Sequence, residues 1–121
     1  MARTGIVVFG HGSSVASAND AVRVVAADAA LLGAWPLYET AFLECDPKLG
    51  AAVEKLVGAG AGEVLVLPYF LTLGIHLQRD LPKIVAELAA EFGVTIRVAP
   101  PLDGHQGLAK MLVDRAIEAE Q

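Results

Sequence analysis

The sequence predicts an α/β fold: a three-layer open sheet of about four parallel strands, in the order 2-1-3-4, with helices on both faces. Strand-like apolar runs alternate with helical patterns along all 121 residues, and the connections between them are short. The runs at residues 4–9 and 63–68 are almost continuously apolar, which is typical of parallel strands buried on both faces. We therefore expect residues 1–121 to form a single domain.

The first half of the chain contains two predicted strand–helix pairs. Residues 4–9 form the first strand, and a helix follows that Ser17 and Asp20 would cap as a capping box. Residues 36–42 form a second, less apolar strand, which we place nearer an edge of the sheet. The pair Asp46–Pro47 predicts the start of the second helix, because Asp is a favoured cap and Pro is favoured at the first helical position.

The second half repeats the pattern. Residues 63–68 form the third strand, which is apolar enough to be central. The next helix is the most clearly amphipathic in the chain, and we expect Asp80 to cap it and Gly93 to end it. Residues 95–98 form a short fourth strand, and apolar residues at helical spacing over 108–116 predict a last helix.

Composition excludes several classes of protein. Hydrophobic residues make up 55% of the chain, but no run approaches the roughly 20 apolar residues of a membrane span, and the N-terminal run is too short for a signal peptide. The lone Cys45 excludes an internal disulfide and suits a reducing compartment, so we expect a cytoplasmic protein. A net charge of −5, with the basic residues scattered, argues against a nucleic-acid partner.

Three polar residues follow the ends of three predicted strands. His11 lies two residues past the first strand, Glu44 two past the second, and His76 in the loop after the third. The carboxyl ends of parallel strands share one edge of the sheet, where ligands bind. Two imidazoles and a carboxylate that meet there would form an open metal site, suited to a divalent ion such as iron, cobalt, nickel or zinc.

Each of these residues also has a simpler explanation. A histidine after a strand is often a loop residue bonded to backbone, and a Glu before a helix commonly interacts with the helix dipole. His105 follows the fourth strand at the same edge, but its glycine-rich surroundings suit a solvated loop. The tract at residues 10–14 lacks the spacing and lysine of a phosphate loop and does not match a serine hydrolase motif.

Three motifs carry a resemblance to a known family. They are FGHGSS at residues 9–14, AFLECDP at 41–47 and VLPYFLTLGIHLQRDLP at 66–82. In order and nearly over the whole chain, they closely resemble the small sirohydrochlorin chelatases of the CbiX type and the related SirB enzymes. One departure is Leu81, where the family usually has Ile, and another is the absence of a histidine-rich tract.

The resemblance implies a class II chelatase fold and an enzyme that inserts Co²⁺, Ni²⁺ or Fe²⁺ into sirohydrochlorin, for cobalamin, siroheme or a related tetrapyrrole. The divalent ion would be a substrate, with no organic cofactor. His11 and His76 would be the metal-binding and catalytic histidines, and Glu44 their carboxylate partner. Short members of the family act as homodimers, so the cleft would lie between two chains.

The substrate carries many carboxylates, whereas this protein is acidic, so local donors must bind it. We expect these to be the backbone N–H groups of Gly12, Ser13 and Ser14 at a helix start, together with Arg79 and Lys83. One alternative is a tetrapyrrole or metal carrier that uses the same three side chains without turnover. Another is a small flavodoxin-like regulatory domain that only dimerises.

Overall fold

The computed structural model describes residues 3–121, which contain one four-stranded parallel sheet in the order β2-β1-β3-β4. Its strands are β1 (Arg3–Gly10), β2 (Tyr38–Phe42), β3 (Ala61–Tyr69) and β4 (Thr95–Val98). All three strand pairs are parallel. The predicted strand order is therefore confirmed, with β2 at an edge and β3 in the interior of the sheet.

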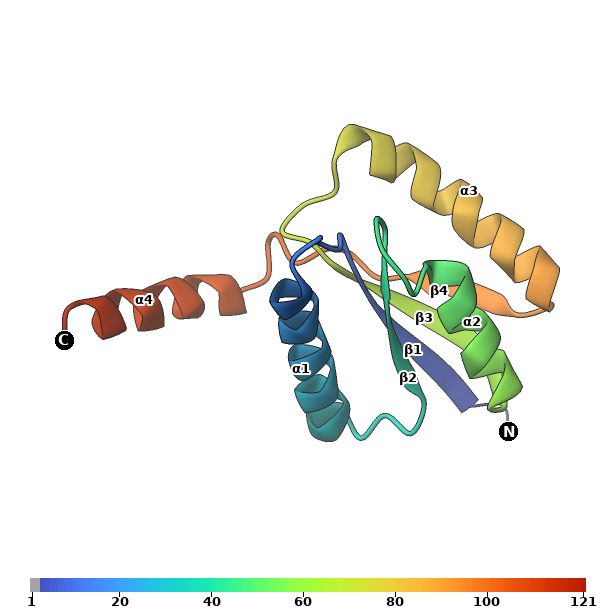
Figure 1. The fold of residues 1–121 in the computed structure, drawn as a ribbon, viewed down its shortest axis with the longest axis horizontal. Helices are drawn as coiled ribbons and strands as arrows, with labels where there is room; N and C mark the ends of the chain where they lie inside the picture. The colour runs from blue at the N-terminus through green and yellow to red at the C-terminus, as the bar shows by residue number, and fades with distance from the viewer. Residues whose placement is uncertain (1–2) are drawn as a thin grey trace.

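Four helices alternate with the strands: α1 (Ala16–Gly33), α2 (Leu49–Gly58), α3 (Ile75–Phe92) and α4 (Gly107–Ala119). Figure 1 shows α1 on one side of the sheet and α2 and α3 on the other, which confirms the three layers. In the same view α4 extends away from the rest of the molecule. None of the helices in residues 3–121 is long and apolar enough to cross a membrane.

The main core lies between the sheet and the helices α2 and α3. Val64 and Val66 of β3 have no exposed surface, and Val53 of α2 is equally buried. Leu81 of α3 closes the same cluster. Because a Val or Leu side chain contributes about 1.5–3 kcal/mol when it is fully buried, this layer holds α2 and α3 firmly against the sheet.

The start of α3 corrects the predicted one. We expected a loop up to Asp80, but the helix begins at Ile75 with Gly74 as its N-cap, so His76 lies in its first turn. Asp80 suggested the later start, because Asp is a favoured N-cap, and Pro82 is a residue type that usually stands at a helix start. Pro82 instead lies inside the helix, and Leu77 packs against the core one turn before Leu81. The partial burial of Leu77 stabilises the helical turns before Asp80 and offsets the cost of the internal proline.

Two other predicted helix starts are also wrong. α1 begins at Ala16, and its N-cap Val15 makes no side-chain capping bond, so Ser17 and Asp20 do not form a capping box. Asp20 instead pairs with Arg23 at 2.8 Å. α2 begins at Leu49 rather than at Asp46–Pro47, because the Pro47 carbonyl accepts the Phe42 N–H at 2.9 Å and thereby extends the turn out of β2.

Candidate functional site

The ends of β1 and β2 bring His11 and Glu44 together. The segments that follow β1 and β2 stay paired beyond the strands. The Leu43 N–H donates to the Gly10 carbonyl at 3.0 Å, and the Glu44 N–H donates to the His11 carbonyl at 2.9 Å. His11 Nε2 then lies 3.7 Å from Glu44 Oε1. Both side chains are more than half exposed, at 59% and 64%, so this pair contributes little to stability and is open to a ligand.

The hydrogen bonding of His11 determines which ring nitrogen is available. Its Nδ1 lies 3.1 Å from the carbonyl oxygen of Gly12. A carbonyl only accepts, so in the neutral ring the proton sits on Nδ1 and the lone pair on Nε2. That lone pair faces the Glu44 carboxylate, and two electron donors that face each other form a favourable place for a cation.

The spacing of this pair fits a divalent metal ion. A tetrahedral ion with bonds of about 2.1 Å to a nitrogen and an oxygen sets those atoms about 3.4 Å apart. The distance between His11 Nε2 and Glu44 Oε1 is 3.7 Å. A contraction of roughly 0.3 Å would therefore place both atoms at bonding distance.

His76 has the opposite arrangement. It is the second residue of α3, and its Nδ1 lies 3.2 Å from Arg79 Nη2. A guanidinium only donates, so Nδ1 accepts this bond and the neutral ring carries its proton on Nε2. Arg79 also contacts Asp80 at 3.4 Å. The only lone pair of His76 is thus occupied by Arg79.

A cavity of about 510 Å³ joins these side chains. It is lined by His11, Leu43, Glu44, Phe70, Thr72, Gly74, Ile75, His76, Leu77, Asp80 and Ile84. The three predicted ligands therefore share one cavity. Across residues 3–121, however, no three side chains of His, Cys, Asp or Glu lie close enough to hold a single ion. His11 and Glu44 form a pair, and His76 stands apart from them.

The predicted donors for substrate carboxylates lie outside this lining. In the described part of the chain, Gly12, Ser13, Ser14 and Arg79 do not line the cavity. The Ser13 N–H already donates to Asn19 Oδ1 at 2.9 Å, and the Asn19 amide donates back to the Ser13 carbonyl at 2.9 Å. The Ser13 N–H is thus engaged in holding the loop, a role of Asn19 that the sequence did not indicate.

Phe70 is a cavity residue that the sequence reasoning missed. Its ring centroid lies 6.4 Å from that of His11 in an edge-on arrangement, and 5.9 Å from that of Phe9. It follows the last residue of β3, so the rule that placed His11 and Glu44 at the strand ends could have found it. Phe70 supports the imidazole of His11 from the β3 side.

Other candidate groups do not reach the cavity. His105 is exposed, and its Nδ1 accepts the Gly107 N–H at 2.9 Å, as expected of a loop histidine. A second hollow of about 470 Å³ lies at β2, lined by Arg23, Tyr38, Glu39, Thr40 and Pro47. It contains no histidine and does not fit the predicted metal chemistry.

Comparisons with family models, with curated proteins and with solved structures all point to one family. The model of the CbiX family matches residues 5–119. A sirohydrochlorin cobaltochelatase from Sulfurisphaera tokodaii is 31% identical over 115 residues, which cover 94% of this chain and 92% of that protein. The chloroplastic sirohydrochlorin ferrochelatase of Arabidopsis thaliana is 31% identical over 113 residues, which cover 92% of this chain but 50% of that protein.

A solved structure of a CbiX protein from Marinobacter aquaeolei VT8 has a TM-score of 0.83 and 31% identity, covering 96% of each chain. The chain spans about half the length of several curated relatives that it matches, with 57%, 50% and 56% of their residues covered. A family model that matches nearly the whole chain, and a solved member that superposes on all of its layers, show that the chain belongs to the CbiX family.

Proposed function

We propose that this protein inserts a divalent metal ion, Co²⁺, Fe²⁺ or Ni²⁺, into sirohydrochlorin. The ion is a substrate, and the reaction uses no organic cofactor. The observation that carries the proposal is the pair of His11 Nε2 and Glu44 Oε1, 3.7 Å apart on the wall of the 510 Å³ cavity. The names of the cobalt- and iron-inserting relatives support the choice of sirohydrochlorin and of Co²⁺ and Fe²⁺.

His11 and Glu44 would bind the incoming ion. The lone pair on His11 Nε2 and the carboxylate charge of Glu44 together suit a borderline divalent ion, and the exposure of both groups lets the ion exchange its water. Two protein ligands leave most coordination positions open. The open positions allow the ring nitrogens of the tetrapyrrole to take over the ion.

His76 would act as a base once Arg79 releases it. Insertion removes two pyrrole N–H protons, and a base within reach of them must have a free lone pair. In the free protein Arg79 occupies the lone pair on His76 Nδ1. A substrate carboxylate that attracts the Arg79 guanidinium would free this nitrogen, which could then take up a pyrrole proton. Substrate binding would thereby convert His76 into a competent base.

The binding of sirohydrochlorin also needs donors beyond the cavity wall. The backbone N–H groups of Gly12 and Ser14, with Arg79, remain our choice for its carboxylates. We further propose that the chain works as a homodimer, as the resemblance implies, in the cytoplasm and without a nucleic-acid or membrane partner. The net charge of −5 supports the absence of a nucleic-acid partner.

Three single histidine variants test this function. His11→Ala and His76→Ala should each lower the rate of anaerobic insertion of Co²⁺, Fe²⁺ or Ni²⁺ into sirohydrochlorin by about 100-fold or more, as followed by absorbance. His105→Ala is the matched control and should stay within about 3-fold of the native rate, because His105 is a loop histidine outside the cavity. Full activity of His76→Ala would remove its assignment as the base.

The same assay separates an enzyme from a carrier. An enzyme converts many equivalents of tetrapyrrole per chain, whereas a carrier binds one equivalent and stops. Insertion that ends at one equivalent, with excess ion and tetrapyrrole present, would replace the catalytic proposal with the carrier.

A further inference from the structure

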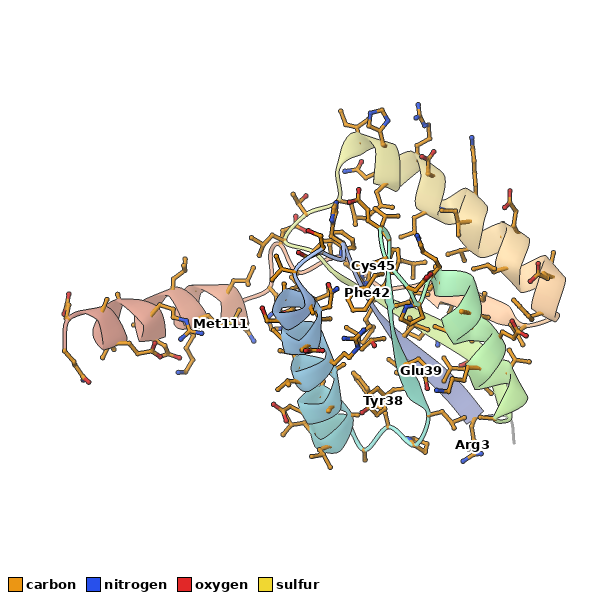
Figure 2. All side chains as sticks on the ribbon, in the orientation of Figure 1. Arg3, Tyr38, Glu39, Phe42, Cys45 and Met111 are labelled. Carbon is orange, nitrogen blue, oxygen red and sulfur yellow. The ribbon has the colours of Figure 1, made fainter. Side chains whose placement is uncertain are left out.

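The last helix is not packed against the rest of its own chain. No residue of α4 is buried, and Figure 1 shows the helix extending away from the three layers. Met111, labelled on α4 in Figure 2, is 53% exposed, and Leu112, Val113 and Ile117 are exposed by 73%, 56% and 52%. Large apolar side chains at this density usually mark a surface that a partner covers.

The apolar surface of α4 is wider than one packing contact needs. At 3.6 residues per turn, Leu108 and Leu112 form one row and Val113 and Ile117 form another. The charged residues lie on the other side of the helix and pair with one another: the Lys110 amine lies 3.2 Å from the Asp114 carboxylate, and the Arg115 guanidinium 2.8 Å from the Glu118 carboxylate. A helix whose apolar side exceeds the usual stripe of about 100° is normally buried on more than one side.

The sheet has a matching uncovered face. Right-handed crossovers place α1 on one face and both α2 and α3 on the other. One helix is about 10 Å wide and strands lie about 4.8 Å apart, so α1 by itself covers about two of the four strands. Leu65 and Leu67 of β3 alternate with the buried Val64 and Val66 and lie on this α1 face, where they remain partly exposed.

An apolar groove runs between α1 and the end of β3. It has a volume of about 190 Å³ and is lined by Val8, Val25, Ala26, Ala29, Trp35, Leu67, Pro68, Tyr69 and Leu102. Val25 is 43% exposed and Tyr69 37%. Leu32, which is 90% exposed, lies one helical turn beyond Ala29 and extends the apolar wall of this α1–β3 groove.

We propose that α4 of one chain packs into the α1–β3 groove of a second copy, and that the second copy returns the same contact. The exchange concerns how the homodimer forms and does not depend on the chelatase activity. It is an isologous contact, in which each molecule contributes one helix and one groove. The two contacts together would cover the apolar side of both α4 helices and the open half of both sheets.

The loop before α4 favours a second copy over the chain's own groove. The Leu102 N–H donates to the Phe70 carbonyl at 2.9 Å, and the Asp103 N–H donates to the Leu71 carbonyl at 2.7 Å. The Gly107 N–H donates to His105 Nδ1, which fixes the first turn of α4 to this loop. The loop is thus tied to the end of β3, and it directs α4 away from the sheet rather than back over it (Figure 1).

Sedimentation equilibrium of the full chain and of two matched variants tests the exchange. The native chain should have the mass of two copies. Leu112→Asp should raise the dimer dissociation constant by about 30-fold or more, because it places a charge in the contact. Leu31→Asp, the control, makes the same change at a residue of α1 that is 83% exposed and lies away from the groove, and it should remain dimeric. A monomeric native chain, or a dimer unaffected by Leu112→Asp, would overturn the exchange.

Cysteine crosslinking distinguishes exchange from a helix that folds back. In a Cys45→Ser background, a mixture of Ala29→Cys and Leu112→Cys chains should form a disulfide between two chains on mild oxidation. The variant that carries both substitutions should also yield covalent dimers. A disulfide formed only within single chains of the double variant would show that α4 occupies its own groove, and it would refute the proposal. Both readouts are masses, so they are independent of the insertion assay.

Discussion

Replacement of Gly12 by alanine tests how the loop beside His11 is held. Gly12 has a φ of +88°, a conformation that disfavours side chains. An added Cβ would lie 2.8 Å from Cys45 Sγ and 3.0 Å from the Cβ of Phe42. In Figure 2 Phe42 and Cys45 lie together at the end of β2, so both of the crowding atoms belong to the neighbouring strand end.

The size of the effect can be worked out from these contacts. The left-handed conformation costs an alanine about 1–2 kcal/mol. Overpacking of a filled site costs typically about 1–3 kcal/mol. Gly12→Ala should therefore lower the free energy of unfolding by roughly 2–5 kcal/mol, which corresponds to a fall in Tm of roughly 8–20 °C for a domain of this size.

Urea unfolding of five proteins separates the two contributions: the native chain, Gly12→Ala, Cys45→Ala, the double variant and Gly58→Ala. Adding Cys45→Ala to Gly12→Ala should recover about 1–2 kcal/mol, because only the contact with Sγ is relieved. Gly58→Ala is the control: its Cβ would meet nothing within 4 Å, and it lies in α2, so it should be neutral or stabilise by up to about 1 kcal/mol. The reasoning fails if Gly12→Ala is as stable as Gly58→Ala, or if the double variant shows no coupling.

Further predictions concern the core and the site. Leu56→Ala, at a side chain 2% exposed, should cost about 2–4 kcal/mol in urea unfolding, and an unchanged midpoint would contradict the core assignment. Glu44→Gln should weaken Co²⁺ binding at least about 10-fold in a calorimetric titration but change stability by less than about 1 kcal/mol, because the pair is exposed. Phe70→Ala should slow insertion by about 10-fold or more through loss of the ring beside His11, whereas a native rate would show that this support is unimportant. Lys55→Met breaks a pair of an exposed lysine with the half-buried Glu39, 3.6 Å apart, and should change stability by less than about 1 kcal/mol in thermal unfolding.

The sheet and the pairing of His11 with Glu44 could be predicted from the sequence, because both depend on short apolar runs that mark the strands. The continuous apolar runs of residues 4–9 and 63–68 mark strands that must be buried on both faces. Once those strands are parallel, their carboxyl ends share an edge, and this placed His11 beside Glu44 without any coordinates. The helix starts at Ala16, Leu49 and Ile75 were missed because they have no side-chain cap, and tertiary packing decided them instead.

The sequence by itself determined the order of the layers and the edge at which the polar groups gather, since hydrophobic patterning acts through burial and does not need atomic detail. Only the tertiary structure decided the hydrogen-bond partners of the two imidazoles: a carbonyl at Gly12 for His11, and a guanidinium at Arg79 for His76. It also decided that α4 leaves its own domain. Both outcomes depend on which groups meet at angstrom distances, and residues far apart in the chain meet only when the whole fold has placed them.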